Sequence, residues 1–508
     1  MVSPDPWVWV VGVVAALTYA LHGFNGLLSR DLSLYSYAGQ QVADGVPPYI
    51  GVMNRAGPLA HAIPALGVGV ARLGGWDDVL VMRATFLVIA AVCTSAVYVL
   101  VRDTFRSPLT GLVGSGAFLT FAGFIHYASN GPREKTPMTL FVVGALWAVT
   151  RRRWFAAGVF VSLATLCLQI AFFPTFTAVA VGAVLLARGH RVRALVRVVL
   201  GGAVPVVIFG VYFALVGSLR QALDAFLLVN ARYTEPDPLL PKLGSSVDDL
   251  LSAYGVSVWP IIAGAVALVA LPLVLRREVD RPVDPSLPVL TAFAVALVTG
   301  LLWNLRDYDA WPDLFPLLPL CAVGIGGLFM VATRRLSQAS TLVLVVVLFA
   351  IATGTAVYES VSRRDDRLET QRASVAAVLD QLPADATVTS LEAPQPLVLG
   401  KKTNPTRYQM FSGGMAPFVD DVWPGGLQAF RRQLVDQPTT LVAVGNTMPP
   451  FWRRGLAPEY EYVGSAPDWL WYARTSLGPE TLSDLRVATG LDPVDDVDRS
   501  AAPGADRE

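Results

Sequence analysis

Residues 29–59, SRDLSLYSYAGQQVADGVPPYIGVMNRAGPL, are the most informative part of this sequence for its fold. This stretch follows an apolar run long enough to cross a bilayer, yet it is polar, aromatic and rich in turn-forming residues. Asp31 stands near its start and Arg55 near its end, and Pro47 and Pro48 stiffen the chain between them. We interpret this loop as the active site, held at a membrane surface by the hydrophobic remainder of the chain.

The composition is that of a membrane protein. Of the 508 residues, 54% are hydrophobic and 15% are charged, whereas soluble domains have about 25% charged residues. The net charge of zero gives no reason to expect nucleic acid as a partner. All three cysteines lie inside apolar runs, so neither a disulfide framework nor a CxxC metal site is expected. The first apolar segment lacks a small-residue cleavage site, and we expect it to be an uncleaved first span.

Eleven apolar runs are predicted to cross the membrane. They lie at 7–28, 79–101, 109–124, 136–149, 154–170, 173–187, 195–216, 256–275, 287–304, 312–332 and 340–357. A further segment, 58–74, is short and broken by proline and glycine, and we place it as an interfacial or re-entrant helix on the outer face. Five short loops rich in arginine then share one side, which is the cytoplasmic signature of a multi-pass plasma (cell) membrane protein. This predicts a cytoplasmic N-terminus and an extracytoplasmic C-terminus.

The composition changes to that of a soluble domain beyond residue 357. The fold class is therefore predicted as an all-α polytopic membrane domain over 1–357, with the active-site loop at 29–78, and a small extracytoplasmic α/β domain over 358–480. The acidic tail, 481–508, is predicted to be disordered. Within the α/β domain we expect helices at 374–382 and 427–434, and strands at 387–391, 440–444, 460–463 and 470–473. The absence of a P-loop or glycine-rich fingerprint argues against an ATP-driven machine.

Asp31 is the best candidate for chemistry. A carboxylate at the end of a helix, in a partly desolvated cleft, can have a raised pKa and act as a general base. The alternative is that Asp31 caps the short helix that follows it, since aspartate is a favoured N-cap. Arg55 could bind a phosphate through its guanidinium, or it could extend to the lipid headgroups.

A second outer loop, Asn130–Pro137, carries three consecutive charged residues, Arg133, Glu134 and Lys135. The loop is either a solvated turn between two spans or a cluster that faces a cleft. In the second case it offers two cations to a phosphate.

A third outer loop, 304–312, carries Arg306 and Tyr308. Gln169 is a polar side chain near the outer end of a span, and polar groups within a membrane are functional candidates. The histidines share no metal-ligand spacing, so a metal site built on histidine is not expected.

Three motifs of the opening stretch resemble the first outer loop of a known superfamily. They are Asp31-x-x-x-Tyr35-x-x-x-Gly39, Gly45-x-x-Pro48-Tyr49 and Arg55-x-Gly57-Pro58-Leu59. The loop is similar to that of the GT-C superfamily, integral-membrane glycosyltransferases that use polyprenyl-phosphate sugars. Within it, the chain resembles the branch containing protein O-mannosyltransferases and the lipid A aminoarabinose transferase, over about residues 7–475.

The sequence departs from that branch at four places. The second acid of the family's acidic pair is Leu32 here, and Arg55 replaces the usual lysine. Asp307-Tyr308 stands where several members have His-Tyr. Leu168 replaces a lysine that family members often have at the position next to Gln169. These changes bear on the donor sugar and the acceptor more than on the general class.

The resemblance implies a glycosyltransferase (EC 2.4 class) that moves a sugar, with inversion, to a hydroxyl of a glycan, lipid or protein. It implies that Asp31 is the general base. It also implies donor-phosphate binding by Arg55, Arg133, Lys135 and Arg306, and donor or acceptor contacts by Tyr35, Tyr49, Glu134, Gln169 and Tyr308. Tyr35 and Tyr49 could instead anchor the loop at the interface. No metal or other cofactor is expected. The alternatives are a lipid-linked glycan transporter or flippase, and a non-catalytic membrane protein.

Overall fold

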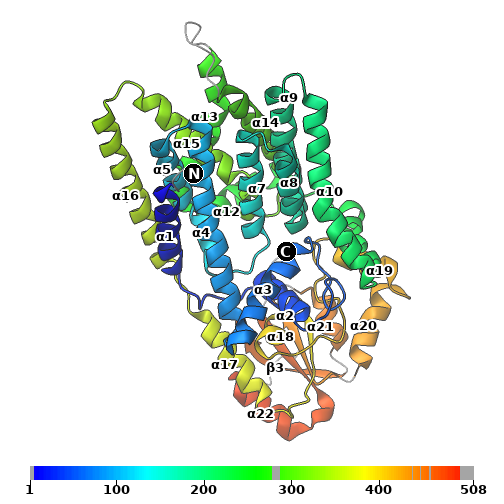
Figure 1. Ribbon diagram of the computed structural model, residues 1–508. Coiled ribbons are helices and arrows are strands. Elements are labelled where there is room, and N and C mark those ends of the chain that lie inside the picture. The colour runs from blue at the N-terminus through cyan, green and yellow to red at the C-terminus, as the bar shows by residue number, and fades with distance from the viewer. Residues whose placement is uncertain (1–4, 277–285, 438, 447, 457–458, 492–508) are drawn as a thin grey trace.

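The computed structural model describes residues 5–276, 286–437, 439–446, 448–456 and 459–491. Long apolar helices stand side by side at one end, and a smaller domain that contains the sheet lies at the other end (Figure 1). Between the two parts lies the stretch 29–59. The molecule is therefore built in two layers that meet at this stretch.

Each of the eleven predicted runs contains a helix. These are α1 (Pro6–Ala20), α4 (Asp78–Phe105), α5 (Pro108–Leu119) with α6 (Ala122–Ala128), α7 (Lys135–Thr150), α8 (Trp154–Cys167), α9 (Phe172–Leu186), α10 (Arg191–Leu215), α13 (Val258–Arg276), α14 (Leu287–Arg306), α15 (Leu318–Thr333) and α16 (Gln338–Ser362). In the described part of the chain, six helical segments are long and apolar enough to cross a membrane, or seven if the α5–α6 pair, bent by 73°, is one span. The other predicted spans contain shorter apolar helices, so the number of crossings stays a prediction.

The opening stretch forms two helices joined by a loop, α2 (Arg30–Ala43) and α3 (Leu59–Gly74). They pack closely because Gly39 has no side chain: a Cβ there would lie 2.6 Å from the Cβ of Pro64. In turn α3 packs on the first half of α4, where Gly67 faces Met82. The predicted short helix at 58–74 is therefore present, and it lies beside α2 at the end of the bundle that carries the smaller domain (Figure 1).

Shorter elements complete the helical part. They are η1 (Gln169–Ala171), α11 (Leu219–Leu223), the π-helix η2 (Asp224–Tyr233), η3 (Leu240–Lys242), α12 (Leu243–Tyr254), η4 (Gly255–Ser257) and η5 (Trp311–Leu314). Two of them, η1 and η2, contact the loop between α2 and α3 through hydrogen bonds described below.

The C-terminal domain has a four-stranded mixed sheet. Its strands are β1 (Val388–Leu391), β2 (Leu441–Gly445), β3 (Tyr460–Ala466) and β4 (Trp469–Arg474), and its helices are α17 (Arg367–Leu379), α18 (Gln395–Leu399), α19 (Met415–Val422), α20 (Gly426–Asp436), α21 (Pro450–Leu456), η6 (Thr475–Leu477) and α22 (Pro479–Thr489). The strand order is β1-β2-β4-β3, with β1 and β2 parallel and the other pairs antiparallel. Every predicted strand and helix of this domain is present. The ends are shifted by up to three residues, except at α17, which begins at Arg367 instead of the predicted residue 374.

The prediction of a disordered tail from residue 481 is wrong over its first part. Residues 479–489 form α22, which buries Leu482 and Leu485 against α17 and β3. The remaining predicted tail, 492–508, lies outside the described residues. The expected boundary at residue 357 also falls inside a continuous helix, α16.

The C-terminal domain is hydrogen-bonded to the opening stretch. The Gln371 side chain accepts from the backbone N–H of Leu28 (2.8 Å) and donates to its carbonyl (3.1 Å). The Tyr37 hydroxyl accepts from the backbone of Asn404 (3.0 Å), and the N–H of Met53 donates to the carbonyl of Arg407 (2.8 Å). The domain is thus docked directly over α2 and the loop that follows it.

Candidate active site

Asp31 lies in the first turn of α2, but it does not cap the helix. Ser29 is the N-cap, and its hydroxyl accepts from the backbone N–H of Leu32 (3.5 Å). The capping role considered for Asp31 is therefore wrong. A carboxylate in the first turn is still favoured by the partial positive charge of the helix N-terminus.

The Asp31 carboxylate lies between two guanidinium groups. Its Oδ2 accepts from Arg133 at 2.5 Å, and its Oδ1 lies 3.4 Å from the Nε of Arg30. Burial alone would raise the pKa of Asp31, but the charges of Arg133 and Arg30 outweigh this effect and hold the pKa well below its usual range. The expectation of a raised pKa is thus wrong, and the group is ionised at neutral pH.

Asp31 is more accessible than Arg133 and Glu134, the two charged residues that face it from the loop before α7. Its side chain is 36% exposed, against 12% for Arg133 and 3% for Glu134. A small group could therefore reach one carboxylate edge while the opposite edge stays fixed by Arg133.

The predicted charged loop at 130–137 lies against α2 and is not a solvated turn. The Arg133 guanidinium lies over the rings of Tyr35 (6.0 Å) and Tyr127 (5.3 Å), and its Nε is 3.4 Å from the Glu134 carboxylate. Tyr35 is buried, and burial together with the charge of Glu134 raises the pKa of its hydroxyl. Arg133 is thus held between α2, α6 and its own loop.

Lys135 is buried and carries its own counter-ion. Its Nζ donates to the Asp313 carboxylate at 2.7 Å, and the second oxygen of that carboxylate accepts from the backbone N–H of Asp309 (2.9 Å). The charge of Lys135 is therefore compensated before any ligand arrives. Asp313 was not singled out in the sequence, because nothing in its local pattern shows which lysine it meets.

Arg55 is placed by its backbone, and its guanidinium has no counter-ion within the described part of the chain. Its carbonyl accepts from the side-chain amides of Gln169 (2.9 Å) and Asn230 (3.0 Å). Its guanidinium donates to the Thr234 hydroxyl (3.2 Å). Among the described residues, no carboxylate forms an ion pair with it. Gln169, a predicted contact residue, therefore acts here by positioning Arg55.

The C-terminal domain closes over Arg55 at a glycine. Gly413 has a φ of +57°, and a Cβ on it would lie 2.5 Å from the Cζ of Arg55. Only a residue without a side chain allows this close approach in that left-handed conformation.

Three predicted residues do not join this cluster. Tyr49 is fully buried, donates to the carbonyl of Ala56 (2.9 Å) and packs on His61 and Phe213. Tyr308 is buried beside Lys242, and the exposed Arg306 lies over the ring of Trp303. Within the described ranges, no hydrogen bond, ion pair or ring contact joins Tyr49, Tyr308 or Arg306 to Asp31 or Arg133.

The structure adds a pair that sequence reasoning missed, Arg30 and Glu392. Arg30 donates to the Glu392 carboxylate at 3.0 Å, while its Nε faces Asp31. Glu392 is buried, follows β1 with a φ of +58°, and also accepts from the backbone N–H groups of Phe411 and Ser412. The C-terminal domain therefore contributes a charge to the immediate surroundings of Asp31.

The comparisons with known proteins bear on the fold. No protein-family model matches the chain, and no curated protein matches it by sequence. ArnT from Cupriavidus metallidurans, solved with undecaprenyl phosphate, superposes with a TM-score of 0.61 at 12% identity, covering 94% of this chain and 100% of that one. The chain has the GT-C fold.

Two further solved structures have a similar fold. The apo form of the same ArnT gives a TM-score of 0.60 at 11% identity, covering 93% of this chain and 99% of that one. An oligosaccharyltransferase from Archaeoglobus fulgidus, solved with Zn and sulfate, gives 0.51 at 13% identity, covering 91% of this chain and 73% of that one. The resemblance that the opening stretch indicated is confirmed at the level of the fold, for both the apolar helices and the C-terminal domain.

Proposed function

We propose that this protein is an integral-membrane glycosyltransferase that moves a sugar from a polyprenyl-phosphate donor to a hydroxyl acceptor with inversion at the anomeric carbon. The observation that carries the proposal is the partly exposed, ionised Asp31 carboxylate held between Arg133 and Arg30. The likeness of fold to an ArnT solved with undecaprenyl phosphate supports the choice of donor lipid.

In the proposed step, the acceptor hydroxyl loses its proton to Asp31 as its oxygen attacks the anomeric carbon. The bond between that carbon and the donor phosphate oxygen breaks, and the electron pair stays on the phosphate. A phosphate leaving group needs no proton, so one carboxylate is enough. Since the low pKa of Asp31 makes it a weak base, proton transfer is expected to accompany C–O bond formation instead of preceding it.

The departing phosphate gains negative charge, so fixed cations near it stabilise the transition state more than the ground state. Arg55 is the first choice, because it has no carboxylate partner in the described chain and is anchored by Gln169 and Asn230. Arg133 is a supporting cation whose main contact is Asp31 itself. Lys135 contributes less, because Asp313 already neutralises it.

We propose that the reaction needs no metal ion. The carboxylates of Asp31 and Glu134 are both engaged by Arg133, and the described residues hold no group of three or more His, Cys, Asp or Glu side chains arranged for an ion. Cationic side chains would supply the charge that a metal supplies elsewhere. Treatment with EDTA should leave the transfer rate unchanged, and a loss restored by added Mg²⁺ or Mn²⁺ would contradict this.

We also propose that the site faces the outside of the plasma membrane. The ends of α4, α7 and α9 and the start of α14 meet at the end of the bundle remote from the C-terminal domain, and arginines stand at the ends of α4 and α7. Arginine-rich loops favour the cytoplasmic side, which would leave Asp31 and the C-terminal domain outside.

The experiment that tests the function uses the full-length protein in nanodiscs, radiolabelled polyprenyl-phosphate mannose and crude membrane acceptors. Transfer to acceptor that is lost in Asp31→Asn is the expected result. A parallel panel of polyprenyl-phosphate glucose and galactose would give the sugar class. Lipid movement between leaflets without sugar transfer would instead identify a flippase and overturn the proposal.

A further inference from the structure

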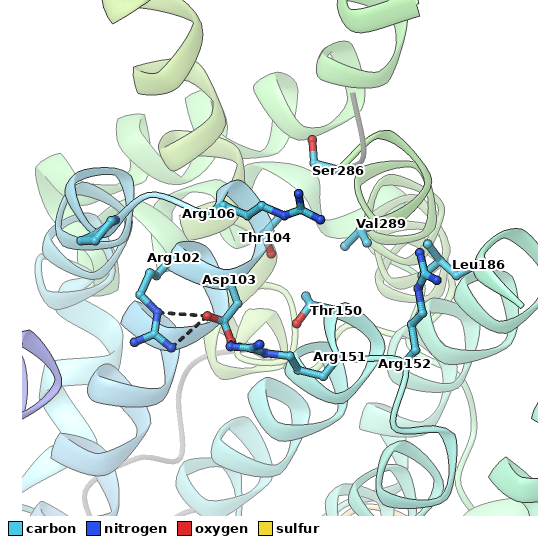
Figure 2. Close-up of a pocket in the computed structure, with 11 residues that line it drawn as sticks. Arg102, Asp103, Thr104, Arg106, Thr150, Arg151, Arg152, Leu186, Ser286 and Val289 are labelled. Carbon is cyan, nitrogen blue, oxygen red and sulfur yellow. Dashed lines mark hydrogen bonds and ion pairs between the residues drawn. The ribbon is translucent and has the colours of Figure 1, made fainter. Parts of the chain in front are cut away.

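A cavity of about 730 Å³ opens at the arginine-rich end of the helices, where the ends of α4, α7 and α9 meet the start of α14 (Figure 2). It is separate from the site around Asp31. Asp78, at the start of α4, is hydrogen-bonded to Gln40 of α2 (3.2 Å), whereas the cavity begins at Arg102 of the same helix. Twenty-four residues of α-helix span roughly 36 Å, so the two sites lie at opposite ends of the bundle.

Two of the four arginines in the wall are already neutralised. The Asp103 carboxylate accepts from Arg102 (2.9 Å), from Arg151 (2.8 Å) and from the Trp147 indole (2.9 Å). Arg102 also donates to Asp5 at 2.7 Å. These contacts build a rigid, charge-compensated wall.

The other two arginines, Arg106 and Arg152, are exposed and have no carboxylate partner within the described residues. In Figure 2 they approach the cavity from opposite sides, with Thr104 and Thr150 between them. Both take left-handed backbone conformations, with φ of 55° and 53°. Glycine takes this conformation most easily, yet here both positions carry a long cationic side chain.

We propose that this cavity binds a phosphate-bearing anion. Guanidinium groups match phosphate oxygens in bidentate geometry, and the two guanidinium groups that have no carboxylate partner among the described residues face one cavity. The volume is within the range of small-molecule sites, about 300–1,000 Å³, so there is room for more than a bare phosphate. Leu186 and Val289 also line the cavity and offer apolar contact to the organic part of the ligand.

Two kinds of ligand carry such a phosphate: a phospholipid, in its headgroup, and a soluble phosphorylated compound. Basic pockets between membrane helices bind anionic headgroups, and the cavity is open at the end of the bundle. This site is independent of the proposed transfer reaction, so binding measurements alone test it.

The test compares wild-type protein with Arg106→Gly/Arg152→Gly. Glycine accepts the left-handed backbone at both positions, so this double variant is expected to fold. Arg191→Ala/Arg193→Ala is the matched control, because it removes two exposed arginines from the start of α10, outside the cavity wall. Circular dichroism and gel filtration check the fold, and Arg106→Gln/Arg152→Gln serves as a second cavity variant.

Two probes separate the sources. Native mass spectrometry from nanodiscs of phosphatidylglycerol and phosphatidylcholine measures retained phosphatidylglycerol, and a titration with inorganic phosphate against chloride at equal ionic strength measures the shift in Tm. We expect wild type and control to show at least one of these signals, and the cavity variants to weaken it about tenfold or more. If the cavity variants lose only the retained phosphatidylglycerol, the ligand is a lipid. If they lose only the phosphate-induced shift in Tm, the ligand is a soluble phosphate. Equal binding by all variants, equal loss in the control, or no binding by wild type would overturn the proposal.

Discussion

The Asp31 carboxylate and the Arg133 guanidinium lie 2.5 Å apart, although 102 residues separate them in the chain. The contact joins the first turn of α2 to the loop before α7. It fixes one edge of the carboxylate and keeps it ionised, while the side chain stays about one-third exposed. The predictions below test what this arrangement does.

Asp31→Asn should fold normally and lose transfer by on the order of 10²–10⁴-fold, because an amide cannot accept the proton. Helix α2 should persist, since Ser29 supplies its cap. Donor binding should survive, because the change removes a negative charge near the phosphate. The rate of transfer and the affinity for donor lipid are measured side by side. Asp44→Asn, at the other end of α2 and paired with Arg72, is the matched control. A folded Asp31→Asn protein with a near-normal transfer rate would contradict the proposed role of Asp31 as the general base.

Arg133→Gln should move the acid limb of the pH profile to higher pH. In the parent, Asp31 stays ionised below its ordinary value of 3.8, because cations lower its pKa. Without Arg133, burial acts with less opposition and the pKa rises, so the ionised base is lost earlier as the pH falls. The measurement is kcat/KM between pH 4 and pH 8. Arg133→Lys keeps a charge and should retain a limb closer to that of the parent. An unshifted limb in Arg133→Gln would show that Asp31 does not set the profile.

Arg55→Ala should lose at least tenfold in kcat/KM, and Arg55→Lys should retain part of the activity. A lysine still attracts phosphate but gives up bidentate geometry. The backbone contacts from Gln169 and Asn230 do not depend on the side chain, so the fold should survive. Arg306→Ala is the comparison, because that guanidinium lies over Trp303. Unchanged turnover in Arg55→Ala would remove Arg55 from the site.

Glu392→Gln should lower transfer by roughly tenfold while the C-terminal domain stays folded. Glutamine can still accept from the Phe411 and Ser412 backbone but no longer neutralises Arg30. Hydrogen bonds to charged groups contribute about 1.5–3 kcal/mol. We expect a value at the lower end of this range because the Arg30 side chain is partly exposed. Transfer and the thermal midpoint are measured together. Glu459→Gln, whose carboxylate lies 3.9 Å from Arg474, is the control. Equal rates in both variants would place Glu392 outside the site's function.

A reporter that is active only in the cytoplasm should be silent when fused after Leu491, and active when fused in the loop after Thr150. The first fusion keeps α22, which packs on the C-terminal domain. The second lies in the arginine-rich loop that the positive-inside rule places in the cytoplasm. The reverse pattern of signals would put Asp31 on the cytoplasmic face and exclude an outer-leaflet reaction.

Much of the fold could be predicted because it depends on local chemistry. Apolar runs such as 195–216 must be helical to satisfy their backbone in lipid, and the β-branched and aromatic residues in 387–391 and 470–473 indicate strands. The same reasoning failed at 479–489, because α22 gains stability from Leu482 and Leu485 packing on the domain, which composition does not show.

For the candidate site, sequence reasoning could identify residues that share one short segment: Asp31 and Arg55 of the opening stretch, and the charged triplet at 133–135. Which of these charges remain available to a ligand depends on the packing of distant segments, which the sequence does not show. Lys135 is neutralised by Asp313, Arg30 is shared between Asp31 and Glu392, and the pKa of Asp31 is lowered instead of raised. The reason is physical: the effective charge of a group depends on neighbours within a few ångströms, and here those neighbours come from segments 102 to 362 residues away in the chain.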